Sequence, residues 1–170
     1  MAILATELTM NLTGGSSNTN VNLSLGGAVS STTVSTTVSE QNLFANVTGS
    51  EASSGSTKYR CIALKNTNST ITLVGSKVWI ATQTPSTDTS IDIGLSAQGL
   101  NSAPTSVANE DTAPASVSFS APATFSAGLS TGDVPASQYY GVWIRRTVLA
   151  SASAYDNDDW QLSWQGETTA

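Results

Sequence analysis

Carboxylates are the residues of this chain that could most readily bind a metal ion or transfer a proton. The stretch 156–159 reads Asp-Asn-Asp-Asp, and oxygen ligands of this kind suit Ca²⁺. The stretch lacks the glycine and the distal glutamate of a helix-loop-helix calcium site, and Asp and Asn are also common in turns. We therefore expect a turn at this position and predict no metal site.

A pair of carboxylates could also serve as the acid and base of a glycosidase, since that reaction needs only two such groups at the right separation. The candidates are Asp88, Asp92, Asp133, Asp156 and Asp158. Nothing in their sequence context indicates a raised pKa, and the chain has neither a histidine nor a G-x-S-x-G motif for a hydroxyl nucleophile. We predict no catalytic residue, no cofactor and no enzymatic activity.

The aromatic residues suggest two other kinds of chemistry. Exposed rings can stack on sugars, and Tyr139, Tyr140 and Trp160 are candidates for that role. Trp79 and Trp143 lie in the middle of the apolar stretches KVWIA and GVWIR. Aromatic side chains in such positions usually fill a core or a subunit interface, and both alternatives remain open here.

Arg145 and Arg146 are the only two basic residues adjacent in the sequence. Neighbouring side chains on a strand point to opposite faces of the sheet. We therefore expect one guanidinium to bind a carboxylate of its own chain and the other to reach an acidic group on a partner subunit.

The elements that must position all these residues are predicted to be strands. Serine and threonine account for 27 and 24 of the 170 residues, and threonine favours extended backbone because its branched Cβ fits the pleat. Few Glu, Lys, Arg or Leu residues stand at helical spacing. One helical turn is expected within residues 40–52.

Stretches of strand-like composition are separated by Gly, Asn, Ser or Pro. They cover residues 57–67, 69–82, 89–96, 116–122, 138–151 and 159–167. Strands spaced by roughly ten residues, with turn signals between them, are typical of a sandwich or jelly roll. We predict an all-β fold, a β-sandwich or jelly-roll-like domain, with a long surface connection over 98–130.

The N-terminal part is more polar than the rest. We predict a single domain over 1–170, in which 1–42 is an extended Ser/Thr/Gly-rich N-terminal arm or edge strands and 43–170 is the main body. Residues 30–39 read SSTTVSTTVS, with Val34 and Val38 on the same face of a strand. Such a strand gains little from burial, so we expect it to pair through its backbone with the sheet edge of a neighbour or of its own subunit.

Composition excludes several classes of partner. Only six residues are basic against twelve acidic, a net charge of −6, and the basic residues form no dense stripe, so nucleic acid is an unsuitable partner. No run of apolar residues is long enough for a membrane span. Residues 1–10 carry no basic residue and no apolar run as long as a signal peptide needs, so we expect no secretory signal there. The single cysteine, Cys61, is expected to be interior, which suits synthesis in a reducing cytoplasm.

Three motifs resemble those of a known group of proteins. The chain has a Gly-Gly-rich start over 12–34, the stretch YRCIALKNT over 59–67, and an ending with GDVPA at 132–136 and VWIRRT at 142–147. In this combination it resembles a family of structural proteins of tailed-bacteriophage virions, and the likeness covers nearly the whole chain.

The resemblance implies a capsid decoration or cement protein on the virion surface, made in the bacterial cytoplasm. Its implied partners are the major capsid protein and further copies of itself, as a homotrimer. A tail, baseplate or fibre module that binds host-surface glycans is the alternative. The residues expected to contact partners are Val34, Val38, Tyr139, Tyr140, Trp143, Arg145 and Arg146.

Overall fold

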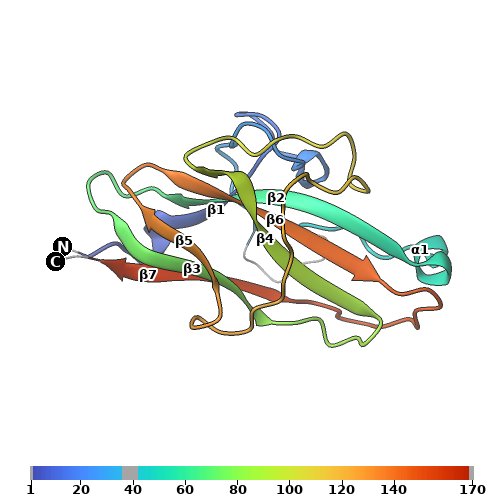
Figure 1. Cartoon of the computed structure of the whole chain (residues 1–170). Helices are drawn as coiled ribbons and strands as arrows, with labels where there is room; N and C mark the ends of the chain where they lie inside the picture. Colours follow the sequence, from blue (N-terminus) through green and yellow to red (C-terminus); the bar gives the residue numbers. More distant parts are fainter. Residues whose placement is uncertain (1, 36–41, 169–170) are drawn as a thin grey trace.

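The fold consists of two antiparallel sheets packed face to face. The computed structural model describes residues 2–35 and 42–168. The larger sheet has four strands in the order β1 (Leu8–Leu12), β2 (Ser56–Asn66), β6 (Tyr139–Val148) and β4 (Thr89–Leu100). The smaller sheet has the order β5 (Leu129–Val134), β3 (Leu73–Thr82) and β7 (Gln161–Thr168). The prediction of an all-β sandwich is therefore confirmed (Figure 1).

Three short helical segments accompany the strands. They are η1 (Ala5–Glu7), η2 (Val21–Leu23) and α1 (Gly49–Ser54). Thr48 caps α1 by accepting a hydrogen bond from the amide of Glu51, whose carboxylate accepts one from the amide of Thr48 in return. Across the described residues, no helix has the length and apolar character needed to span a membrane.

Alternating apolar side chains fill the space between the sheets. Strand residues two positions apart share a face, and the larger sheet contributes such pairs from three of its strands to this core. The buried members are Leu43, Phe44, Ile62, Leu64, Val78, Ile80, Ile91, Ile93, Val142 and Ile144. Trp160, Leu162 and Trp164 pack against them from β7 and the residue before it, as their common face in the sequence predicts.

A second, smaller core lies on the outer face of the four-stranded sheet. Tyr59, Cys61 and Trp143 are buried there under Val107, Val117 and Phe119. The last three belong to the connection between β4 and β5, which crosses over the sheet. Two glycines allow its close approach: a Cβ on Gly94 would lie 2.5 Å from Val117, and one on Gly141 would lie 2.4 Å from Pro104. The predicted surface connection is thus a cover that buries the outer face.

The N-terminal segment forms the edge of the same sheet. β1 pairs with β2, and the residues of 30–34 bond to the free side of β1: the amides of Ser30 and Val34 donate to the carbonyls of Leu12 and Met10, and the Leu12 amide donates to the Thr32 carbonyl. For the first half of SSTTVSTTVS, the backbone partner is therefore the chain's own sheet. Val38 lies outside the described residues.

Residues 13–29 also join the cover on the outer face. The hydroxyls of Thr13 and Ser24 both donate to the Cys61 carbonyl, and the Cys61 amide donates to the Ser24 carbonyl. The Gly27 amide donates to the Pro104 carbonyl in the β4–β5 connection. Figure 1 shows the blue N-terminal loops and the yellow connection on the same side of the sheet.

Candidate functional site

The acidic stretch 156–159 is part of the connection between β6 and β7. The Asp158 carboxylate accepts hydrogen bonds from the Ser86 amide and the Thr89 hydroxyl, and so ties this connection to the β3–β4 loop and to the start of β4. Among residues 2–35 and 42–168, no three His, Cys, Asp or Glu side chains are grouped so as to hold a metal ion. Asp158 therefore has a structural use.

Three of the other acidic candidates also bond within the chain. Asp92 binds Arg145, and Asp133 accepts a hydrogen bond from the Gly75 amide at a bulge between β3 and β5. Asp88 accepts one from the Ser153 amide. Each of these three carboxylates thus bonds to a group of its own chain.

Trp143 is a core residue of its own chain. Its side chain is 1% exposed and packs beside Tyr59 and Cys61 in the outer-face core. The expectation that Trp143 contacts a partner is therefore wrong for this fold, because the β4–β5 connection already covers it. Cys61 is likewise buried, and burial raises the pKa of its thiol. An uncharged, buried thiol packs as a small apolar group.

Arg145 and Arg146 point to opposite faces, as expected, but both are bound within the chain. Arg145 forms an ion pair of 3.0 Å with Asp92 on β4 and lies over the ring of Phe119. Arg146 lies over the ring of Phe44, and its guanidinium donates to the Ala45 carbonyl. Arg146 is 8% exposed, so the structure offers no free guanidinium for an acidic partner at this pair.

A compact charge cluster surrounds Arg146 at the α1 end of the sandwich. Lys58 lies 2.6 Å from carboxylate oxygens of both Glu51 and Glu110, and Glu110 also pairs with Arg60. Burial alone would raise the pKa of Glu51, but hydrogen bonds from Lys58 and Thr48 outweigh it and lower that pKa to about 2. The cluster links α1, β2 and the β4–β5 connection.

The remaining residues expected at an interface are half-buried. Tyr140 stands on β6 opposite Leu64 of β2 and Leu100 of β4. Val34 packs against the main core beside β1. Tyr139 lines a groove on the outer face of the four-stranded sheet.

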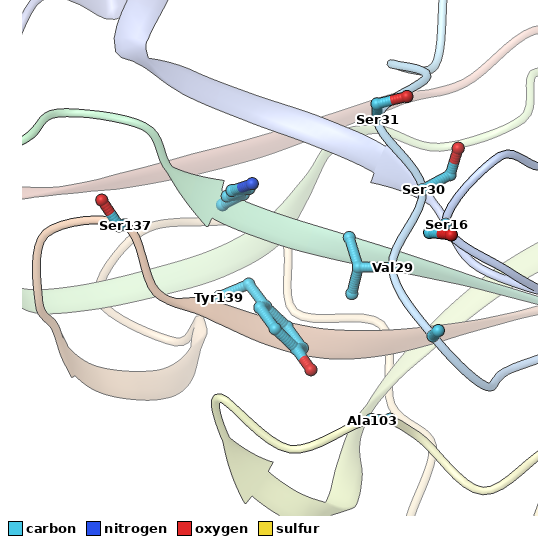
Figure 2. A pocket seen from close by; sticks show the side chains of 9 residues that line it. Ser16, Val29, Ser30, Ser31, Ala103, Ser137 and Tyr139 are labelled. Atoms are coloured by element: carbon cyan, nitrogen blue, oxygen red, sulfur yellow. The ribbon is translucent and has the colours of Figure 1, made fainter.

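This open groove presents a cation, hydroxyls and an aromatic ring together. It has a volume of about 470 Å³, within the range of about 300–1,000 Å³ typical of small-molecule sites. The residues that line it are Ser16, Ala28, Val29, Ser30, Ser31, Lys65, Ala103, Ser137 and Tyr139. Figure 2 shows Tyr139 between the turn that carries Ser137 and the N-terminal loop that carries Val29 and Ser30.

An aromatic pair marks the outer face of the smaller sheet. The rings of Trp79 and Phe125 meet edge to face, with centroids 5.7 Å apart, and Lys77 lies over Phe125. Phe125 is 40% exposed. Trp79 is thus neither in the main core nor fully free, because the β4–β5 connection folds back over it.

The groove was not predicted from the sequence, although Tyr139 was singled out. Its wall residues come from the N-terminal loop, the β4–β5 connection and the β5–β6 turn, which are far apart in the chain. The one usable signal was a tyrosine at the start of a strand, next to the turn Pro-Ala-Ser-Gln over 135–138.

The chain matches no protein-family model, no curated protein and no solved structure. Its function therefore has to be inferred from its own residues and their arrangement.

Proposed function

We propose that this chain is a non-enzymatic structural protein of a bacteriophage virion, a decoration or cement protein that binds the outer capsid surface. Two of the three motifs of the resemblance lie on strands: YRCIALKNT forms most of β2, and the ending motif has GDVPA across the end of β5 and VWIRRT on β6. Its partners would be the major capsid protein and further copies of itself, as a homotrimer.

The observation that carries this proposal is where the charges lie. Four of the six cationic side chains, Lys58, Arg60, Arg145 and Arg146, are paired with carboxylates of the same chain. The charged groups are thus largely used to hold the sandwich together, and a surface rich in hydroxyls remains. Hydroxyls lose less on desolvation than charges do when a partner covers them.

The mechanism would be adhesive. A rigid sandwich that bridges neighbouring capsid subunits would add hydrogen bonds and apolar contacts across their boundary. Expansion of the shell under the pressure of packaged DNA would then have to break those contacts first. Since each contact is weak, the effect depends on many copies acting together.

A tail, baseplate or fibre module that binds host-surface glycans is the second candidate. Tyr139 favours it, because its half-exposed ring lies in a hydroxyl-lined groove. Trp160 does not favour it, because this side chain packs against the main core.

The copy number of this chain in purified virions tests the proposal. Quantitative mass spectrometry would compare it with the major capsid protein of the same particles. A copy number of the same order as that of the major capsid protein is expected for a decoration protein. A ratio near that of the neck and tail proteins would contradict the capsid role and favour the second candidate.

A further inference from the structure

The groove is the part of the outer sheet face that the two covering segments leave open. Tyr139 on β6 and Lys65 on β2 are cross-strand partners, and they form its floor. Next to them, Gly141 is covered by Pro104, and further along the face Trp143 is sealed in the outer core. The cover therefore ends before this pair of residues and leaves the Lys65 ammonium and the Tyr139 ring accessible.

Lys65 differs from the other basic residues of the chain. Four of these form ion pairs, and Lys77 donates to the Ser126 carbonyl and lies over the Phe125 ring. The Lys65 ammonium has neither a carboxylate nor a hydrogen-bond acceptor within the part of the chain that the structure describes. A protein with a net charge of −6 thus keeps a lysine ammonium without a partner among the described residues, and this ammonium lies in the groove.

Hydroxyls surround this floor. The side chains of Ser16, Ser31 and Ser137 line the groove without a hydrogen-bond partner among the described residues. Ser30 is different, because its buried hydroxyl already donates to the Asn18 carbonyl and accepts from the Thr32 amide. Three hydroxyls that can each donate and accept are therefore available to a ligand.

The ring of Tyr139 supplies the apolar surface. Partial burial raises the pKa of its phenol, so the group stays uncharged at neutral pH. The apolar face of a pyranose ring can pack on such an aromatic face while its hydroxyls hydrogen-bond to the rim.

A peptide ligand fits this place less well. β2 and β6 are inner strands of the sheet, and their backbone groups pair with each other and with β1 and β4. An extended peptide would find no free strand edge on this floor.

From these observations we infer that the groove binds a carboxylated saccharide unit, such as a hexuronic acid residue of a surface polysaccharide. Tyr139 packs on the sugar ring, Lys65 binds the carboxylate, and Ser16, Ser31 and Ser137 bind hydroxyls. The inference names the ligand class of the glycan-binding candidate and rests on that candidate. It does not depend on the capsid role, since a decoration protein can also carry such a groove.

The test uses the purified full chain and a matched pair of ligands: trigalacturonate and its methyl ester, which has the same sugar rings without the charge. Binding is followed by NMR titration with assigned amide resonances. We expect saturable shifts around Lys65, Ser137 and Tyr139, and binding of the ester roughly fivefold weaker, because a partly exposed ion pair contributes about 1 kcal/mol.

Variants separate the contributions of the individual groups. Lys65→Gln should abolish the preference for the acid over the ester. Tyr139→Ala should weaken the binding of both ligands. Lys77→Gln, on the other sheet, is the matched control and should change the affinity for neither ligand. Ala28→Trp, at the exposed wall of the groove, should block both ligands without altering the floor.

Three outcomes would overturn the inference in different ways. Equal binding of acid and ester would retain a glycan site but refute its selectivity for carboxylates. Equal binding of trigalacturonate and triglutamate would show that the groove recognises a carboxylate without the sugar. Absence of saturable binding, with the fold intact by circular dichroism, would refute the glycan site as a whole, and the copy number in virions would be unaffected.

Discussion

At the scale of single residues, Glu51 has the most consequential environment. It caps α1, binds Lys58 and lies 3.9 Å from the Arg146 guanidinium. One carboxylate thus connects a helix start to two strands of the large sheet. Because these contacts require its charged form, Glu51 links the stability of the fold to pH.

Glu51→Gln is predicted to make the free energy of unfolding depend less steeply on pH in the acidic range. The folded-state pKa of about 2 lies below the ordinary value of 4.5, so ionised Glu51 stabilises the fold fully above about pH 4.5, and this contribution is lost as the pH falls toward 2. Urea unfolding at a series of pH values should show a less stable variant at pH 7 with a shallower loss on acidification. Glu167→Gln, at an exposed position on β7, should keep the wild-type slope; the same slope in Glu51→Gln would contradict the prediction.

Trp143→Ala is predicted to destabilise the protein by about 3–5 kcal/mol, the usual range for emptying a large aromatic site in a core. The reason is its position under the β4–β5 connection, with the side chain 1% exposed. Chemical denaturation measures the loss. Leu149→Ala, at a side chain that is 54% exposed, is the control and should cost little. A small loss of stability in Trp143→Ala would contradict the core role of this side chain and favour an interface role.

At the scale of elements, the outer face shows how a cover is fitted to a sheet. Strands β4 and β6 each place a glycine where the β4–β5 connection comes closest. These glycines are needed for space, since any side chain would collide with the cover. The contacts between the cover and the sheet therefore require that Gly94 and Gly141 carry no Cβ.

Gly94→Ala is predicted to destabilise the fold by about 1–3 kcal/mol, as overpacking usually does. Its new Cβ would lie 2.5 Å from a Val117 methyl group and 2.6 Å from the Ser118 carbonyl oxygen, so the cover would have to move. Thermal unfolding measures the change in stability. Gly49→Ala, at the first residue of α1 with open space around it, is the matched control and should be neutral or slightly stabilising.

The N-terminal loop is held by a different device, a pair of hydroxyls on one carbonyl. Ser24→Ala removes one donor to the Cys61 carbonyl and the acceptor of the Thr13 amide. A loss of about 1–3 kcal/mol is expected, because the amide is left unpaired in a buried place. Ser17→Ala, at an exposed position of the same loop, serves as the control. Equal urea midpoints for the two variants would show that the loop is not anchored at this point.

At the scale of the whole molecule, the sequence predicted the strands well and their environments less well. Alternating and continuous apolar stretches located most strands within a few residues, and the low charge of the chain favoured a packed fold over disorder. Only the tertiary fold, however, reveals that the long connection buries the outer face. This is why a mid-strand tryptophan could be read either as core or as interface.

The candidate site was less predictable than the fold. Lys65 and Tyr139 are far apart in the sequence and meet only through the pairing of β2 with β6. The pairing of Arg145 with Asp92 likewise depends on the register of β4 against β6. Side-chain periodicity tells which face a residue occupies, but not which strand lies beside it or which loop crosses above it.

The capsid proposal predicts self-association. A homotrimer is expected for the isolated chain, because identical copies at a threefold capsid position would contact each other through equivalent surfaces. Native mass spectrometry at micromolar concentration measures it. A monomer over the whole concentration range would contradict the expectation of trimers in solution, and a stable dimer would contradict threefold symmetry.

The interlocked cover on the outer face also has a consequence for how the protein is made. The Gly27 amide donates to the Pro104 carbonyl and the Val107 amide to the Leu25 carbonyl, so the loop over 13–29 cannot complete its contacts until residue 107 has left the ribosome. Contacts so distant in sequence slow folding. During that interval the early segment is exposed with few apolar groups and many hydroxyls, a composition that keeps a waiting chain from aggregating with its neighbours.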